Sequence, residues 1–106
     1  MKSNRDPRHL NRIKRFKQFF SDSFQARQFD PEIDEMITKN APDWPIAKLN
    51  KVDLAILRLA ISELKNNRQI PPKVIVDEAI EIGKLYGSEK TAKFINGVLG
   101  SLIKHD

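Results

Sequence analysis

Basic side chains gather near the start of the chain at a spacing that suits a polyanionic ligand. Arg8, Arg12 and Arg15 fall on one side of a predicted helix, and Phe19 projects from that same side, while Arg5 lies just before them. Guanidinium groups neutralise phosphates, and an aromatic ring among them can stack on a base. Two ordinary alternatives stay open, a solvated helix face for the arginines and a core contact for Phe19.

The net charge of +5 is confined to this segment. Residues 1–28 hold eight basic side chains against two acidic ones, a balance of +6, whereas residues 29–106 hold eleven against twelve, a balance of −1. A local basic block of this kind favours a polyanion such as nucleic acid, because each neutralised phosphate releases condensed counterions.

Residues suited to catalysis or metal binding are few and badly spaced. The chain has no cysteine, and its two histidines, His9 and His105, have no paired partner in the sequence, so neither is expected to bind a metal. No glycine-rich phosphate loop precedes a helix. Asp77, Glu78 and Glu81 show no sign of a pocket and are expected to face solvent or pair locally. The sequence therefore predicts a protein that is not an enzyme and needs no cofactor.

Size and hydropathy predict one soluble domain. A chain of 106 residues suits one core, and no apolar run approaches the roughly 20 residues of a membrane span. The first residues lack the apolar stretch of a secretory signal. We therefore expect a cytoplasmic protein without a membrane partner.

Helical periodicity runs along the whole chain and predicts an all-α, compact bundle of five to six helices. Asp6-Pro7 and Asp30-Pro31 read as helix starts. Trp44, between two prolines, is the expected apolar anchor of a connector. The expected helices cover about 7–27, 31–40, a segment from 46 that contains 54–64, 72–86, and from Ser88 to about 104.

Several predictions concern the interior. The first helix has an apolar stripe of Leu10, Ile13, Phe16, Phe20 and Phe24, and the fourth is expected to turn Leu85 or Tyr86 inward at its end. The segment 54–64 is apolar on most sides and should be the central helix.

Charged and glycine positions in the later helices also predict contacts. Arg58 is expected to pair with Glu63 or Glu78 as a structural lock. Gly97 and Gly100 lie inside the last helix, where each costs about 1 kcal/mol relative to alanine. Close packing by another helix is the commoner reason for such glycines, and approach of a ligand backbone is the other.

Three sequence blocks in the second half resemble the C-terminal subdomain of the NusB family. They are Val52-Asp53-Leu54-Ala55-Ile56-Leu57-Arg58-Leu59-Ala60-Ile61-Ser62-Glu63-Leu64, Ile70-Pro71 with 74–84, and Lys93-Phe94-Ile95-Asn96-Gly97-Val98-Leu99, in the order and spacing of that family. The resemblance covers about residues 44–102. It implies a single NusB-like domain, with a basic N-terminal helical subdomain at 1–43 and a three-helix C-terminal subdomain at 44–106.

The resemblance also implies a function. Members of the family act in transcription antitermination and support ribosomal RNA transcription, binding single-stranded, boxA-type RNA together with NusE, a small-subunit ribosomal protein, in the elongation complex. The residues that this places at RNA are Arg5, Arg8, Arg12 and Arg15 by position, and Lys90, Lys93 and Phe94 beside the Phe-Ile-Asn-Gly block. Asp53 is placed on the surface that faces NusE.

The chain also departs from the family pattern. About one helix is missing between the first helix and Trp44, which would expose apolar surface and favour a homodimer. Gly100 stands where the family commonly has Asp. Two other functions remain open, a helical protein-interaction adaptor and an RNA-targeting module like that of ribosomal RNA methyltransferases.

Overall fold

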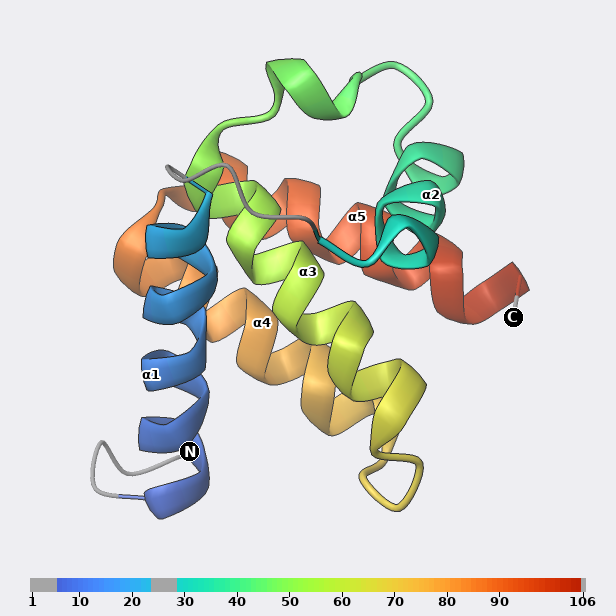
Figure 1. The fold of residues 1–106 in the computed structure, drawn as a ribbon. Coiled ribbons are helices and arrows are strands. Elements are labelled where there is room, and N and C mark those ends of the chain that lie inside the picture. Colours follow the sequence, from blue (N-terminus) through green and yellow to red (C-terminus); the bar gives the residue numbers. More distant parts are fainter. Residues whose placement is uncertain (1–5, 24–28, 106) are drawn as a thin grey trace.

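One central helix organises the molecule, and the other helices pack around it (Figure 1). The computed structural model describes residues 6–23 and 29–105. Within these residues the secondary structure is entirely helical, which confirms the predicted all-α bundle. The elements are α1 (Pro7–Asp22), α2 (Pro31–Asn40), the short 3-10 helix η1 (Ile46–Lys48), α3 (Lys51–Asn66), α4 (Pro72–Tyr86) and α5 (Glu89–His105).

The helices begin where the polar residues predict. The carboxylates of Asp6 and Asp30 each accept a backbone N–H bond two residues further on, and a proline follows each cap. The side chain of Asn50 accepts the Asp53 N–H at 2.8 Å and starts α3. The predicted end of the first helix is wrong, because α1 ends at Asp22. Residues 24–28, with the expected core residue Phe24, lie outside the described residues.

The prediction that α3 is central is confirmed. Every residue from 53 to 63 is buried, so this helix is covered on all sides. Its large side chains meet those of α4 and α5, and Ile56, Leu57, Ile75, Ile95 and Leu99 are each at most 1% exposed. Burying a side chain of this size contributes about 1.5–3 kcal/mol, so α3, α4 and α5 form the stable framework that carries the site.

Three apolar predictions are wrong. Leu10, Trp44 and Leu85 are 48%, 53% and 57% exposed. On α1 the buried positions are His9, Arg12 and Phe16, so the helix turns a partly polar side toward the bundle. Carboxylates of α3 and α4 accept these polar groups, and helical periodicity alone cannot detect such partners.

Arg58 is paired, but not with Glu63 or Glu78 as predicted. Its guanidinium binds Asp34 of α2 through two bonds of 2.9 and 2.8 Å, and it lies 3.6 Å from the centre of the Phe29 ring. The expectation that a buried arginine needs a partner therefore holds. The error arose because α2 crosses α3 at this position, which the sequence does not show.

The described helices are also too short or too polar for a bilayer. None of them could cross a membrane.

Candidate nucleic-acid interface

α1 attaches to the bundle through buried ion pairs. The Arg12 Nε donates to both carboxylate oxygens of Glu63 on α3, at 2.9 and 3.1 Å, and its Nη1 lies 3.6 Å from Glu78 of α4. His9 Nδ1 lies 2.8 Å from Glu78 Oε2. All four side chains are buried. These residues form the α1 clamp, defined here as His9, Arg12, Glu63 and Glu78.

The predicted basic face of the first helix is wrong at Arg12, because this residue belongs to the α1 clamp. Arg12 is only 5% exposed and faces inward, so it does not share a surface with the other arginines as predicted. Arg8 is exposed and Arg15 is half-buried. Phe19 is half-buried and packs against the core, which favours the core-contact alternative for its ring. Arg5 lies outside the described residues.

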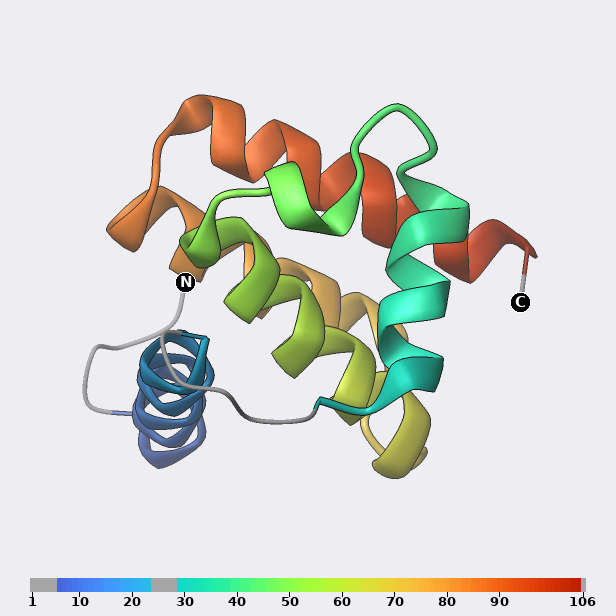
Figure 2. The same ribbon diagram turned by 45° about the horizontal axis from the view of Figure 1, so that its top comes forward.

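The predicted residues of α5 meet an aromatic side chain from the connector. The rings of Trp44 and Phe94 are packed edge to face, with centroids 6.4 Å apart and planes at 77°. Figure 2 shows the connector and η1 running alongside α5. The Trp44 ring is 53% exposed, so it remains available for stacking.

Two hollows adjoin this aromatic pair. One, of about 420 Å³, includes Lys48, Asp53 and Lys90 in its wall, and the other, of about 230 Å³, includes Lys93 and Gly97. Trp44 and Phe94 line both. We call this surface the aromatic groove and define it by Trp44, Phe94, Lys48, Lys90, Lys93 and Gly97.

The lysines of the aromatic groove are available to a ligand. Lys48, Lys90 and Lys93 are exposed, and none forms a hydrogen bond or ion pair with another described residue. A ring flanked by uncompensated ammonium groups suits a ligand that has both flat bases and phosphates. Sequence reasoning missed Trp44 and Lys48 as site residues, although the proline-flanked tryptophan was visible as an unusual connector residue.

The glycines of α5 are not explained by helix packing, which was the commoner expectation. A Cβ atom added at Gly97 or Gly100 would meet nothing within 4 Å. Both positions are exposed. Neither glycine is therefore needed for a contact within the described part of the chain, and Gly97 leaves the helix backbone open where it borders the aromatic groove.

Asp53 lies at the inner wall of the groove rather than on an open surface. It is 8% exposed, and its Oδ1 atom is buried without a hydrogen-bond partner in the part of the chain that the structure describes. Burial raises the pKa of its carboxyl group, while hydrogen bonds with Thr91 and Asn50 lower it to a smaller extent. The predicted role of Asp53 at a protein partner therefore requires that the partner reach this recessed position.

We predict that Asp53→Asn stabilises the protein increasingly as pH rises. Because the folded-state pKa of Asp53 is above its ordinary value of 3.8, the folded chain keeps this proton to higher pH than the unfolded chain. In the parent protein, the stabilisation that comes from protonated Asp53 is present at low pH and is lost as pH rises through the folded-state pKa of this group. Thermal unfolding of both proteins between about pH 4 and pH 7 tests this. A difference in Tm that is constant across the range would contradict it.

α1 lies close to the beginning of α5. The ring of Phe16 is 5.2 Å from that of Tyr86, the last residue of α4, and the Lys17 ammonium lies 5.7 Å from the centre of the same ring. Figure 1 shows α1 beside the corner where α4 leads into α5. Lys90 lies in the first turn of α5, so the second half of α1 and this lysine belong to neighbouring parts of the fold.

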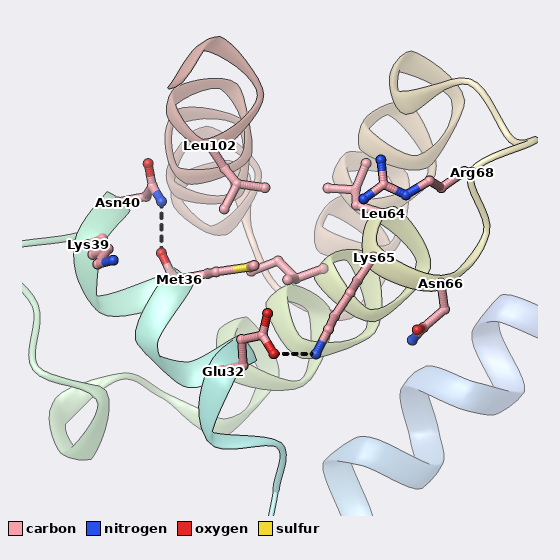
Figure 3. Close-up of a pocket in the computed structure, with 10 residues that line it drawn as sticks. Glu32, Met36, Lys39, Asn40, Leu64, Lys65, Asn66, Arg68 and Leu102 are labelled. Carbon is pink, nitrogen blue, oxygen red and sulfur yellow. Dashed lines mark hydrogen bonds and ion pairs between the residues drawn. The ribbon is translucent and has the colours of Figure 1, made fainter. Parts of the chain in front are cut away.

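A larger hollow on another face has a different character (Figure 3). It has a volume of about 690 Å³ and an aliphatic floor that includes Met36, Leu64 and Leu102. Its Lys65 is already paired with Asp30 and Glu32, at 2.9 Å each. It contains no aromatic ring and none of the predicted site residues, so the aromatic groove is the better candidate for a nucleic-acid interface.

Comparison with known proteins places the chain in a family. It is 57% identical over 72 residues to "Transcription antitermination protein NusB" of Clostridium botulinum, which covers 68% of this chain and 50% of that protein. It is 48% identical over 75 residues to the protein of the same name from Listeria innocua, which covers 71% of this chain and 59% of the relative. The chain thus spans about half the length of the curated relatives it matches. The sequence profile of the NusB family matches residues 11–104, and the chain therefore belongs to the NusB family.

Proposed function

We propose that this chain is an RNA-binding transcription antitermination factor that acts by binding, without catalysis. One observation supports this most directly: the exposed Trp44 ring, packed on Phe94, is flanked by three lysines that have no partner among the described residues. Stacking on the ring would hold a base, and the ammonium groups would hold the phosphates on either side. The relatives' name, transcription antitermination protein, supports the same role.

The proposed RNA path runs over a basic surface, which consists of the exposed cations of α1 and those of α5. Arg8 and Arg15 of α1, rather than Arg12, would contact the phosphates, and Lys90 and Lys93 of α5 would continue the contact into the aromatic groove. An acidic protein partner would also be attracted by these cations. An exposed ring flanked by three ammonium groups matches the alternation of flat bases and phosphates in single-stranded RNA, and on this ground we favour RNA over the adaptor alternative.

Membership of the NusB family supports the partners that we propose. We propose that the RNA is boxA-like, that NusE binds alongside it, and that both act in the elongation complex in the cytoplasm. Asp53, at the start of α3, is the candidate contact for NusE. A homodimer is the alternative assembly, which the exposed Leu10 and Leu85 side chains would favour.

Titration with RNA tests this function. A boxA-like RNA and a scrambled RNA of equal length would be titrated with and without NusE at two salt concentrations. We expect the boxA-like RNA to bind more tightly, more so with NusE, and both affinities to fall with salt. Equal affinity for the two RNAs in every condition would reduce the protein to a general polyanion binder.

Gly97→Ala is expected to separate folding from binding. Alanine in this exposed helix should raise the free energy of unfolding by up to about 1 kcal/mol, because nothing lies within 4 Å of the new Cβ. It should weaken RNA binding by about 1 kcal/mol, roughly fivefold, if RNA approaches the helix backbone there.

Gly100→Ala is the matched control, since it is equally open but lines neither hollow of the groove. It should be stabilised to a similar extent and should bind RNA like the parent protein. Unfolding curves and RNA titrations of both variants give the comparison. Equal RNA affinities for the two variants would count against the groove as the RNA site.

A further inference from the structure

The imidazole of His9 has one satisfied and one unsatisfied nitrogen. The side chain is 1% exposed, and its Nδ1 lies 2.8 Å from Glu78 Oε2. The other ring nitrogen, Nε2, is buried and has no hydrogen-bond partner among the described residues. A buried polar atom without a partner is unfavourable and uncommon in folded proteins, so something at this position is expected to satisfy Nε2.

A carboxylate faces the unsatisfied nitrogen. Glu81 Oε1 lies 3.9 Å from His9 Nε2, beyond hydrogen-bond distance. One ligand atom from each of His9, Glu78 and Glu81 lies within 4.8 Å of the others. Glu78 and Glu81 are one helical turn apart on α4, which places both carboxylates toward α1. The fold thus assembles an imidazole and two carboxylates from positions that are far apart in the sequence.

We propose that His9 and Glu81 bind a divalent transition-metal ion, with Zn²⁺ as the best match. Zinc takes imidazole nitrogen and carboxylate oxygen at about 2.0–2.2 Å, so two such ligands of a tetrahedral ion lie roughly 3.4 Å apart. The observed 3.9 Å needs only a small movement. Glu81 can supply it, because its side chain is 37% exposed and borders solvent. Water completes the coordination.

Glu78 acts as the orienting carboxylate of this site. Glu78 Oε2 lies 2.8 Å from Nδ1, and in the Nδ1–H tautomer of the imidazole it accepts a hydrogen bond that leaves Nε2 without a proton and able to bind a metal. The other oxygen of Glu78 faces Arg12 Nη1 at 3.6 Å, which holds the carboxylate in place. A carboxylate behind a ligating histidine is a common arrangement in zinc sites. The ion would link α1 directly to α4.

Zinc binding by the full chain tests the proposal without RNA. Isothermal titration of metal-free protein with Zn²⁺ at neutral pH should show one saturable equivalent, and thermal unfolding should shift upward with Zn²⁺ concentration. Glu81→Gln and His9→Gln should each weaken this binding at least tenfold. His105→Gln, which changes the other histidine of the chain, should leave it unchanged.

Glu81→Gln keeps the test decisive if His9→Gln unfolds, because Glu81 is partly exposed. Absence of saturable Zn²⁺ binding, or equal Zn²⁺ affinity in Glu81→Gln and the parent protein, would overturn the proposal. A proton is the competing occupant. If nitrogen NMR shows both ring nitrogens of His9 protonated at neutral pH with Zn²⁺ present, the imidazole bridges the two carboxylates as a cation and the metal site is rejected.

Discussion

Glu63→Ala is expected to lower the free energy of unfolding by about 3–5 kcal/mol. Both carboxylate oxygens of Glu63 accept from the Arg12 Nε, and the Glu63 and Arg12 side chains are 6% and 7% exposed. Removing the carboxylate leaves a buried guanidinium with one weaker contact, 3.6 Å from Glu78. Because a domain of this size has a total stability of only about 5–15 kcal/mol, the variant should be close to unfolding at ordinary temperatures.

Glu35→Ala is the control for this measurement. Glu35 also pairs with a cation, Lys39 at 3.2 Å, but both side chains are mostly exposed. The loss there should be at most about 0.5 kcal/mol. Urea unfolding followed by circular dichroism compares the two variants. Equal midpoints would show that the Arg12–Glu63 pair does not hold α1, and replacing both Arg12 and Glu63 by methionine should recover much of the lost stability.

Trp44→Ala should weaken RNA binding by about 1–3 kcal/mol, which is roughly fivefold to 150-fold in Kd. The expected cause is loss of the stacking surface, since the ring is 53% exposed and contacts Phe94 by its edge. Fluorescence anisotropy with a labelled boxA-like RNA measures the affinity. Stability should change less than in a core variant, because about half of Trp44 is already exposed to solvent in the folded protein.

Leu85→Ala is a matched control for the loss of an exposed apolar side chain. Leu85 is 57% exposed and lies on α4, outside both hollows of the aromatic groove. We expect RNA affinity to stay within twofold of the parent protein. If Trp44→Ala binds RNA as tightly as Leu85→Ala does, the base does not stack at Trp44 and the proposed interface lies elsewhere on the basic surface.

The helices could be predicted from the sequence because their signals are local. Asp6 and Asp30 before prolines mark two helix starts, and the apolar segment around Ile56 could only be a central helix. Each of these features depends on residues within one or two turns. The predicted bundle is therefore confirmed, and the end of α1 is the clearest error in helix bounds.

The partners of charged residues could not be predicted, because they depend on how the helices cross. Arg58 meets Asp34, 24 positions away, and Arg12 meets Glu63, 51 positions away. The arginines of the first helix looked equivalent in the sequence, since all carry the same charge at helical spacing. In the folded chain Glu63 lies opposite Arg12 and accepts its hydrogen bonds. Arg12 therefore holds α1 on the bundle and is not available to a ligand.

The candidate site was predicted in part. Lys90, Lys93 and Phe94 do lie together at one surface, but their placement at RNA came from family resemblance rather than from their spacing. Trp44 is predicted from the sequence as the apolar anchor of a connector, and its exposure depends on how the connector lies on α5, which the sequence does not show. The metal site proposed at His9 could not be expected from the sequence, since Glu78, which would orient the imidazole, is 69 positions away along the chain.

The α1 clamp has a consequence for the register of the first helix. An interface of interdigitated aliphatic side chains tolerates small sliding, whereas hydrogen-bonded ion pairs depend on distance and direction. Sliding α1 along its axis by one turn, about 5.4 Å, would separate Arg12 from Glu63 and His9 from Glu78 together. The helix therefore has one register and one rotation on the bundle, and Arg8 is presented to solvent at a set distance from the start of α5.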